Sequence, residues 1–208
     1  FPVAARHHLA CVIARPPPDH AVVHQISHQH GVISVHCDTR RVIQLVQDPL
    51  EDDHWFLVNQ RGPIQRFGPD HASPMAVLDL TDVIFTEHHE TGTIDLVFHP
   101  NFEQTRYAYV IYSAMGGSSQ FDSRLSRFEV NGDMTFDRES EVILFVEPQA
   151  HGSHSMNHAV FGADGMLYVA NGDGGNGIGQ PHGQDTTTTK GAILRLDVDN
   201  PQGSFNYG

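Results

Sequence analysis

The chain has 208 residues, which is enough for one sizeable domain or for part of a larger one. It carries 25 acidic and 12 basic residues, and its formal net charge is -13 with the histidines neutral. Such an acidic surface repels phosphate backbones, so we expect no nucleic-acid partner. No apolar run approaches the ~18 residues of a membrane-spanning helix, so we also expect no membrane span.

Residues 1–40 are the least regular part of the sequence. Histidines recur there at spacings of four, four and two, at His20, His24, His28 and His30. That spacing fits a helical metal site, whereas the branched residues at 32–35 favour a strand equally. We interpret residues 1–40 as a His-rich, solvated or poorly ordered extension without an assigned role. Cys11 and Cys37 fit either a disulfide of an exported protein or two free thiols.

From residue 41 onward the sequence is a succession of short apolar segments separated by Gly, Pro, Asn and Asp. These patterns predict strands at 42–46, 55–58, 64–67, 75–80, 94–98, 107–112, 124–130, 141–146, 159–161, 166–170 and 192–198. No segment keeps an apolar period of 3.6 residues, so we expect few helices.

Three of the predicted strands look like copies of one unit. They read WFLV, YAYV and MLYV, and their last residues, Val58, Val110 and Val169, recur after 52 and 59 residues. Four short strands in a period of ~40–60 residues are typical of β-propeller blades. We therefore predict an all-β fold in which residues 41–208 form about three four-stranded antiparallel blades. Closed propellers usually need four or more, so we expect the chain to be part of a longer protein.

The stretch 151–173 concentrates the residues that could carry chemistry. An Ala-Asp-Gly turn between two apolar runs predicts a hairpin, and His151, His154 and His158 lie just before it or at its start. Loops held by a rigid scaffold often carry function. One histidine acting as a general base is the first hypothesis. The alternatives are three imidazoles that bind zinc and histidines that only hydrogen-bond within the loop.

Two further features could belong to a site. The glycine-rich stretch 171–177 could wrap calcium with carboxylate and carbonyl oxygens, although such loops are common in all-β proteins. Glu90 precedes the strand at 94–98, as the histidine loop precedes the corresponding strand one repeat later. It is either a site residue or a solvated turn acid.

Four motifs in register resemble the glucose/sorbosone dehydrogenase family, over residues from about 55 to the C-terminus. Residues 90–102, ETGTIDLVFHPNF, resemble the family pattern E-x-G-L-L-G-L-A-F-H-P-x-F. Residues 123–128, SRLSRF, match a second motif, and His154 with the turn at 162–165 matches H-x-G-G-x-L-x-F-G-P-D-G. Finally, GDGG at 172–175, Gln184-Asp185 and GAILRLD at 191–197 follow GDGG…QD…GKILRID.

The resemblance implies the N-terminal half of a six-bladed propeller that oxidises an aldose with pyrroloquinoline quinone (PQQ). His154 would be the catalytic general base that takes the proton of the anomeric hydroxyl while hydride passes to the quinone, and Glu90 and His154 would lie by the cofactor. The resemblance also implies calcium, an external electron acceptor and a periplasmic or extracellular location. Most ligands of the cofactor and of calcium are expected from later blades, so residues 1–208 alone could be inactive.

The sequence departs from the family pattern at Met156 and Asn157, where the family has small residues, and at Ala192, where a lysine or polar residue is usual. Bulkier side chains after His154 could narrow the pocket or change the substrate. The alternative function is a non-catalytic propeller that binds a protein partner, because the same fold occurs in hedgehog-interacting proteins. His154 together with Glu90 favours the enzyme.

Overall fold

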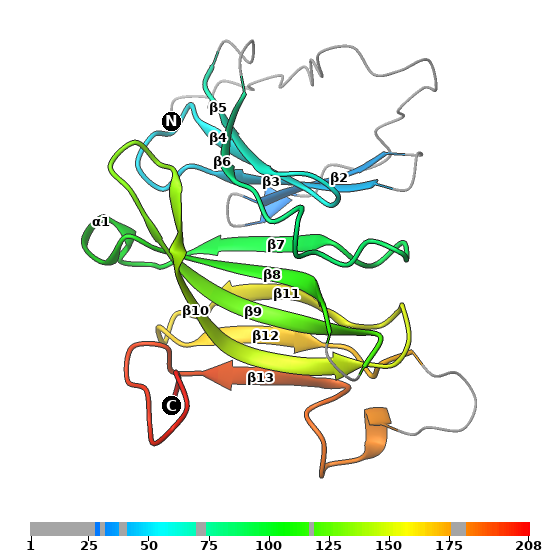
Figure 1. Ribbon diagram of the computed structural model, residues 1–208. Helices are drawn as coiled ribbons and strands as arrows, with labels where there is room; N and C mark the ends of the chain where they lie inside the picture. The colour runs from blue at the N-terminus through cyan, green and yellow to red at the C-terminus, as the bar shows by residue number, and fades with distance from the viewer. Residues whose placement is uncertain (1–27, 30–31, 38–40, 70–73, 117–118, 176–181) are drawn as a thin grey trace, which may run out of the picture.

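A computed structural model describes residues 28–29, 32–37, 41–69, 74–116, 119–175 and 182–208 (Figure 1). The fold is all-β, with three antiparallel sheets stacked face to face. The first sheet contains β1 (His28–Gln29), β2 (Val32–Cys37), β3 (Arg41–Gln47), β4 (Trp55–Asn59), β5 (Ile64–Phe67) and β6 (Met75–Leu78). The second contains β7 (Thr93–Phe98), β8 (Tyr107–Met115), β9 (Phe121–Val130) and β10 (Phe136–Gln149). The third contains β11 (Met156–Phe161), β12 (Leu167–Asn171) and β13 (Ala192–Leu196).

The predicted fold class is confirmed, and every predicted strand is present. Only two short helices occur in the described residues, α1 (Phe102–Thr105) and η1 (His182–Gln184). The second sheet has the four strands expected of a blade, the first is extended to six by β1 and β2, and the described part of the third has three. The domain boundary at residue 40 stays a prediction, although residues 32–37 pair with β3. Cys11 lies outside the described residues, so its pairing with Cys37 is also still a prediction.

The second sheet is buried on both faces, and β8 shows why its sequence is almost wholly apolar. Ala108, Val110 and Tyr112 point into a core shared with the first sheet. Tyr109 and Ile111, which alternate with them, point into a core shared with the third. Successive side chains of a strand face opposite sides, so a strand between two cores needs apolar residues at every position.

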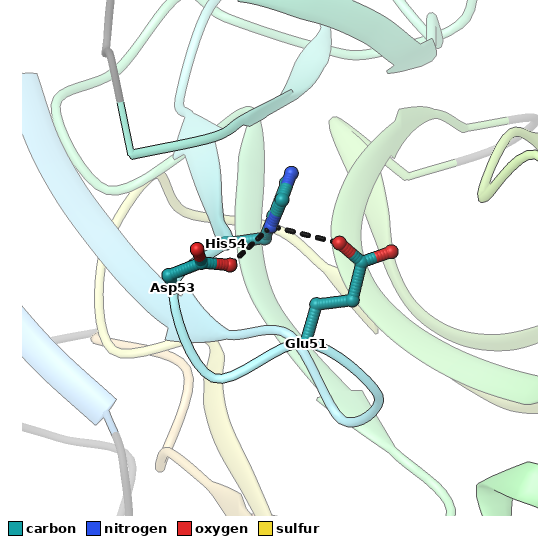
Figure 2. Close-up of side chains that lie close together, drawn as sticks. All are labelled: Glu51, Asp53 and His54. Carbon is teal, nitrogen blue, oxygen red and sulfur yellow. Dashed lines mark hydrogen bonds and ion pairs between the residues drawn. The ribbon is translucent and has the colours of Figure 1, made fainter.

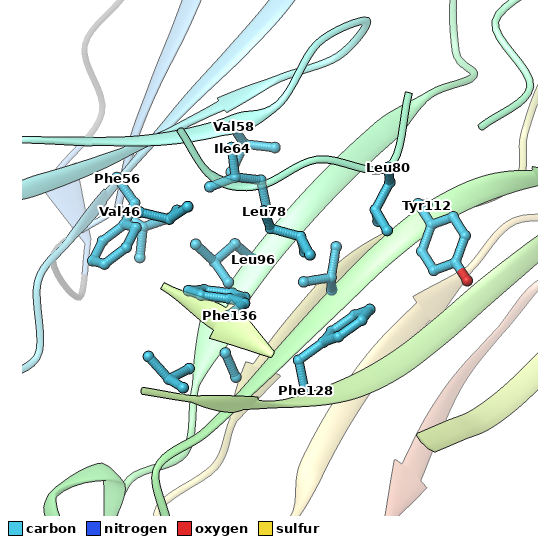
Figure 3. Packing of buried hydrophobic residues seen from close by; sticks show 14 of the residues in the cluster. Val46, Phe56, Val58, Ile64, Leu78, Leu80, Leu96, Tyr112, Phe128 and Phe136 are labelled. Carbon is cyan, nitrogen blue, oxygen red and sulfur yellow. The ribbon is translucent and has the colours of Figure 1, made fainter. Parts of the chain in front are cut away.

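Aromatic rings fill the core between the first and second sheets. Phe56 of β4 is fully buried, and its ring lies 4.9 Å from that of Phe98 and 6.1 Å from that of Phe136. Figure 3 shows Phe56, Val46 and Leu78 of the first sheet facing Leu96 and Phe136 of the second. These contacts join the sheets face to face, as blades join in a propeller.

Strand β7 lies at the seam between the sheets, against β3 and β4 of the first sheet and β11 of the third. The turn that leads into β7 is fastened to the first sheet, because Thr93 N–H donates to the carbonyl of Gln60 at 2.9 Å. Gly92 makes this approach possible. Its φ is +124°, and a Cβ at this position would lie 2.0 Å from the Gln60 carbonyl oxygen. The glycine of the E-x-G motif thus sets the position of Glu90.

We expect Gly92→Ala to lower the free energy of unfolding by about 2 kcal/mol or more, because alanine meets both the strained φ and the Gln60 carbonyl. Urea denaturation followed by the fluorescence of Trp55, the single tryptophan, measures the change. Gly132→Ala is the matched control, since a Cβ there meets nothing within 4 Å. Equal losses in the two variants would show that the close approach at Gly92 has no energetic consequence.

Candidate active site

Glu90 and His154, which are 64 residues apart, come together at one end of the sheets. Glu90 lies in the turn before β7, and His154 lies in the equivalent loop before β11. The backbone N–H of His154 donates to Glu90 Oε2 at 2.6 Å. His154 has a φ of +54°, an uncommon conformation for a residue other than glycine. Its carbonyl accepts a hydrogen bond from Gly174 N–H at 3.0 Å, so both sides of the strained residue are held.

Asp173 orients the imidazole of His154. The Nδ1 atom of His154 lies 2.9 Å from Asp173 Oδ1, which also accepts the Gly175 N–H at 3.0 Å. The Gly175 N–H and the His154 imidazole lower the pKa of Asp173, which therefore stays ionised at neutral pH. Because an ionised carboxylate accepts a hydrogen bond, the neutral form of the imidazole carries its proton on Nδ1 and has Nε2 as an acceptor. The His154 side chain is 61% exposed, so this acceptor can reach a substrate.

Asp173 was not among the site residues chosen from the sequence. The signal was present in the GDGG motif, but the motif alone does not say which side chain the aspartate meets. A general base oriented by a carboxylate is a recurrent arrangement in enzymes. Here the base and the carboxylate, His154 and Asp173, are 19 residues apart in the sequence.

The other two histidines of the loop do not join His154. The His158 Nδ1 atom lies 3.1 Å from Asp95 Oδ2, and His151 is exposed. These three imidazoles are not among the groups of metal-ligating side chains that converge in the described part of the chain. The zinc alternative therefore gains no support from the geometry.

Asp95 of β7 is a buried carboxylate that links all three sheets. Its Oδ1 atom accepts from the side chain of Gln44 on β3. Its Oδ2 atom accepts the backbone N–H of Ala159 at 2.6 Å and contacts His158, both on β11. Asp95 is 2% exposed, so its oxygens find their hydrogen-bond partners in these groups rather than in water.

Asp95 raises the pKa of His158, and this coupling predicts a pH dependence of stability. Because the folded-state pKa lies above the unfolded value of ~6.5, the stabilisation is fully present below pH ~6.5. It is lost as the pH rises through the folded-state pKa. We expect His158→Asn to lower the melting temperature more at pH 5.5 than at pH 8.5. Equal losses at the two pH values would contradict the coupling.

The one group of side chains in the described residues with metal-ligand spacing lies elsewhere, between β3 and β4. The His54 Nδ1 atom lies 3.0 Å from Glu51 Oε2 and 2.8 Å from Asp53 Oδ1 (Figure 2). Arg66 lies 3.1 Å from the other oxygen of Glu51, and its positive charge opposes a cation there. In the glycine-rich loop, Asp173 is engaged with His154, while residues 176–177 lie outside the described ranges. Calcium binding stays a prediction.

Three blade-like sheets joined face to face, with a carboxylate-oriented histidine on a loop at one end, define a part of a β-propeller with a candidate acid–base site. The sequence model of the family described as Glucose / Sorbosone dehydrogenase matches residues 45–206. The chain belongs to this family.

Individual relatives agree with the family. The aldose sugar dehydrogenase YliI of Escherichia coli is 24% identical over 167 residues, which are 74% of this chain and 43% of that protein. The mouse Hedgehog-interacting protein is 30% identical over 127 residues, which are 57% of this chain and 18% of that protein. The chain thus spans less than half the length of either relative.

Among solved structures, the PQQ-bound aldose sugar dehydrogenase of Streptomyces coelicolor superposes with a TM-score of 0.60. The identity is 17%, and the match covers 93% of this chain and 56% of that one, so it supports the shared fold. Within the described ranges, no helix is long and apolar enough to cross a membrane.

Proposed function

We propose that the protein is a sugar dehydrogenase that oxidises the anomeric carbon of an aldose with PQQ as hydride acceptor. The observation that carries the proposal is the His154–Asp173 pair, because it supplies an exposed, oriented proton acceptor at the position of the family's histidine motif. A non-catalytic propeller has no need for this arrangement.

Each residue of the pair and its neighbour has a defined task. Nε2 of His154 accepts the proton of the anomeric hydroxyl, and the ionised Asp173 stabilises the imidazolium that forms. Glu90 holds the backbone of His154 in its strained conformation. PQQ, when bound, supplies the quinone that takes up the hydride.

The described residues fit the proton-accepting side of such a site better than its cofactor-binding side. Glu90 and His154 have exposed side chains that can lie against a cofactor. The carboxylates of PQQ call for basic partners. Lys190, the first lysine or arginine after Asp173 in the sequence, already contacts Glu147 and the Pro148 carbonyl. We infer that the basic partners, and calcium if present, come from other parts of the full-length protein.

The test is dye-linked oxidation of a panel of aldoses by the full-length protein after addition of PQQ and calcium. We expect reduction of the dye that requires PQQ. The matched control is the same protein without PQQ, which reports any oxidation by the dye alone. A folded protein that oxidises no aldose in the presence of PQQ would contradict the proposal.

The second candidate is a propeller that binds a protein partner. The similarity to the Hedgehog-interacting protein favours it, together with Met156 and Asn157 at positions where the family pattern has glycines. Capture of a secreted protein by the purified chain, without PQQ-dependent oxidation, would favour this function over the dehydrogenase.

A further inference from the structure

We propose that Lys190, the only lysine of the chain, is a positioning residue that keeps Asp173 in place to orient the His154 imidazole. The inference rests on the proposed role of His154. It assigns a task to a side chain that none of the sequence motifs singles out, because the family lysine falls at the position of Ala192.

The side chain of Lys190 is largely covered by the protein. It is 15% exposed, and Nζ donates to the carbonyl of Pro148 at 2.9 Å and to Gln149 Oε1 at 3.4 Å. The buried carboxylate of Glu147 lies 3.9 Å away. An ammonium group that donates to several acceptors is held in place more firmly than that of a lysine that extends into water.

Residues 189–191 contact the loop that carries Asp173 at three points. Asn171 Nδ2 donates to the Thr189 carbonyl at 3.0 Å, and Gly191 N–H donates to the Gly172 carbonyl at 3.0 Å. At the third point, a Cβ on Gly174 would lie 3.1 Å from Lys190 Nζ, so the ammonium group lies beside Gly174 and leaves little room for a side chain there.

The loop needs such support because of its composition. Asp173 stands in a Gly-Asp-Gly-Gly sequence, and glycine permits many backbone conformations. Gly174 and Gly175 both have positive φ, at +83° and +65°. Gly174 N–H also donates to the His154 carbonyl, so a displaced Gly174 would disturb both partners of the Asp173–His154 contact.

Glu147 anchors this support to the second sheet. It lies near the end of β10, is 7% exposed, and accepts from Thr189 Oγ1 and from Asn171 Nδ2, the latter at 3.3 Å. The Asp173 loop of the third sheet is therefore fixed to β10 through the residues on both sides of it. Lys190 is the part of this bridge that lies beside Gly174, the residue after Asp173.

The first experiment compares the full-length protein with its Lys190→Met variant by ¹⁵N spectroscopy of histidine side chains, with the His154 signals assigned from a His154→Asn variant. We expect one tautomer with the proton on Nδ1 in the unmodified protein and a mixture of tautomers in Lys190→Met. Arg195→Met is the matched control, because Arg195 lies on β13 and pairs with the exposed Asp164 instead. It should leave the His154 spectrum unchanged.

The second readout is kinetic. We expect kcat for aldose oxidation to fall about ten- to a hundredfold in Lys190→Met while KM changes less than about threefold, because the base is misplaced and the sugar contacts stay. The double variant Lys190→Met, Glu147→Gln removes both members of the ion pair and leaves no unpaired carboxylate at position 147. It can therefore be measured if the single variant does not fold. It should show the same mixture of tautomers.

An unchanged His154 tautomer in either variant would overturn the inference, even where the melting temperature falls. The spectroscopic result is independent of the proposed function. If the unmodified protein oxidises no aldose but Lys190→Met still mixes the tautomers, the positioning role stands and the dehydrogenase assignment fails.

Discussion

Replacing His154 with alanine is expected to lower kcat/KM for PQQ-dependent aldose oxidation by about 10²–10⁴-fold in the full-length protein. The variant loses the acceptor for the anomeric proton, so the hydroxyl must lose its proton to water while the hydride leaves. Stability should change little, because the side chain of His154 is 61% exposed and touches one exposed carboxylate. Dye-linked kinetics and a thermal melt of the same sample measure both quantities.

Two further variants sharpen this test. Asp173→Asn keeps the size of the side chain but removes the charge that stabilises the imidazolium, so we expect a smaller loss than for His154→Ala. His151→Ala is the matched control, because His151 lies in the same loop, is exposed and is not part of the His154 site. Activity of His154→Ala within tenfold of the unmodified protein would show that another group accepts the proton.

The pattern of apolar residues predicted where the strands occur, because a strand forms where its side chains can be buried. The pattern did not predict where the strands end, because polar contacts determine the ends. Strand β10 runs from Phe136 to Gln149, well beyond the predicted 141–146, because its polar half pairs with β9 through a bulge after Asp137. Strand β6 ends at Leu78 because Asp79 accepts the Thr81 backbone N–H and turns the chain.

Site residues that belong to a sequence motif could be predicted. Those whose role depends on a contact between sheets could not. Glu90 and His154 were chosen from motifs, and the structure brings them together. The contact of Lys190 with Gln149 spans 41 residues and that of Asp95 with Ala159 spans 64. Such pairs depend on how one sheet packs on the next, which no local period in the sequence specifies.

The second large effect concerns Asp95, the carboxylate shared by the three sheets. We expect Asp95→Ala to lower the free energy of unfolding by about 3 kcal/mol at pH 7. The variant leaves the buried N–H of Ala159 without its acceptor, and it removes the Asp95 acceptor of the Gln44 amide, a side chain that is 6% exposed. It also removes the partner of His158. Urea denaturation followed by Trp55 fluorescence measures the loss.

Asp164→Ala is the matched control for Asp95→Ala. Asp164 also pairs with a basic side chain, Arg195, but its carboxylate is 40% exposed, and exposed ion pairs contribute little to stability. The family pattern quoted above has glycine at the position of Asp95. If Asp95→Ala costs no more than Asp164→Ala, the three sheets are held together without a net contribution from this carboxylate. A loss several times larger would show that the buried carboxylate fixes how β3, β7 and β11 meet, and with them the loops that carry Glu90 and His154.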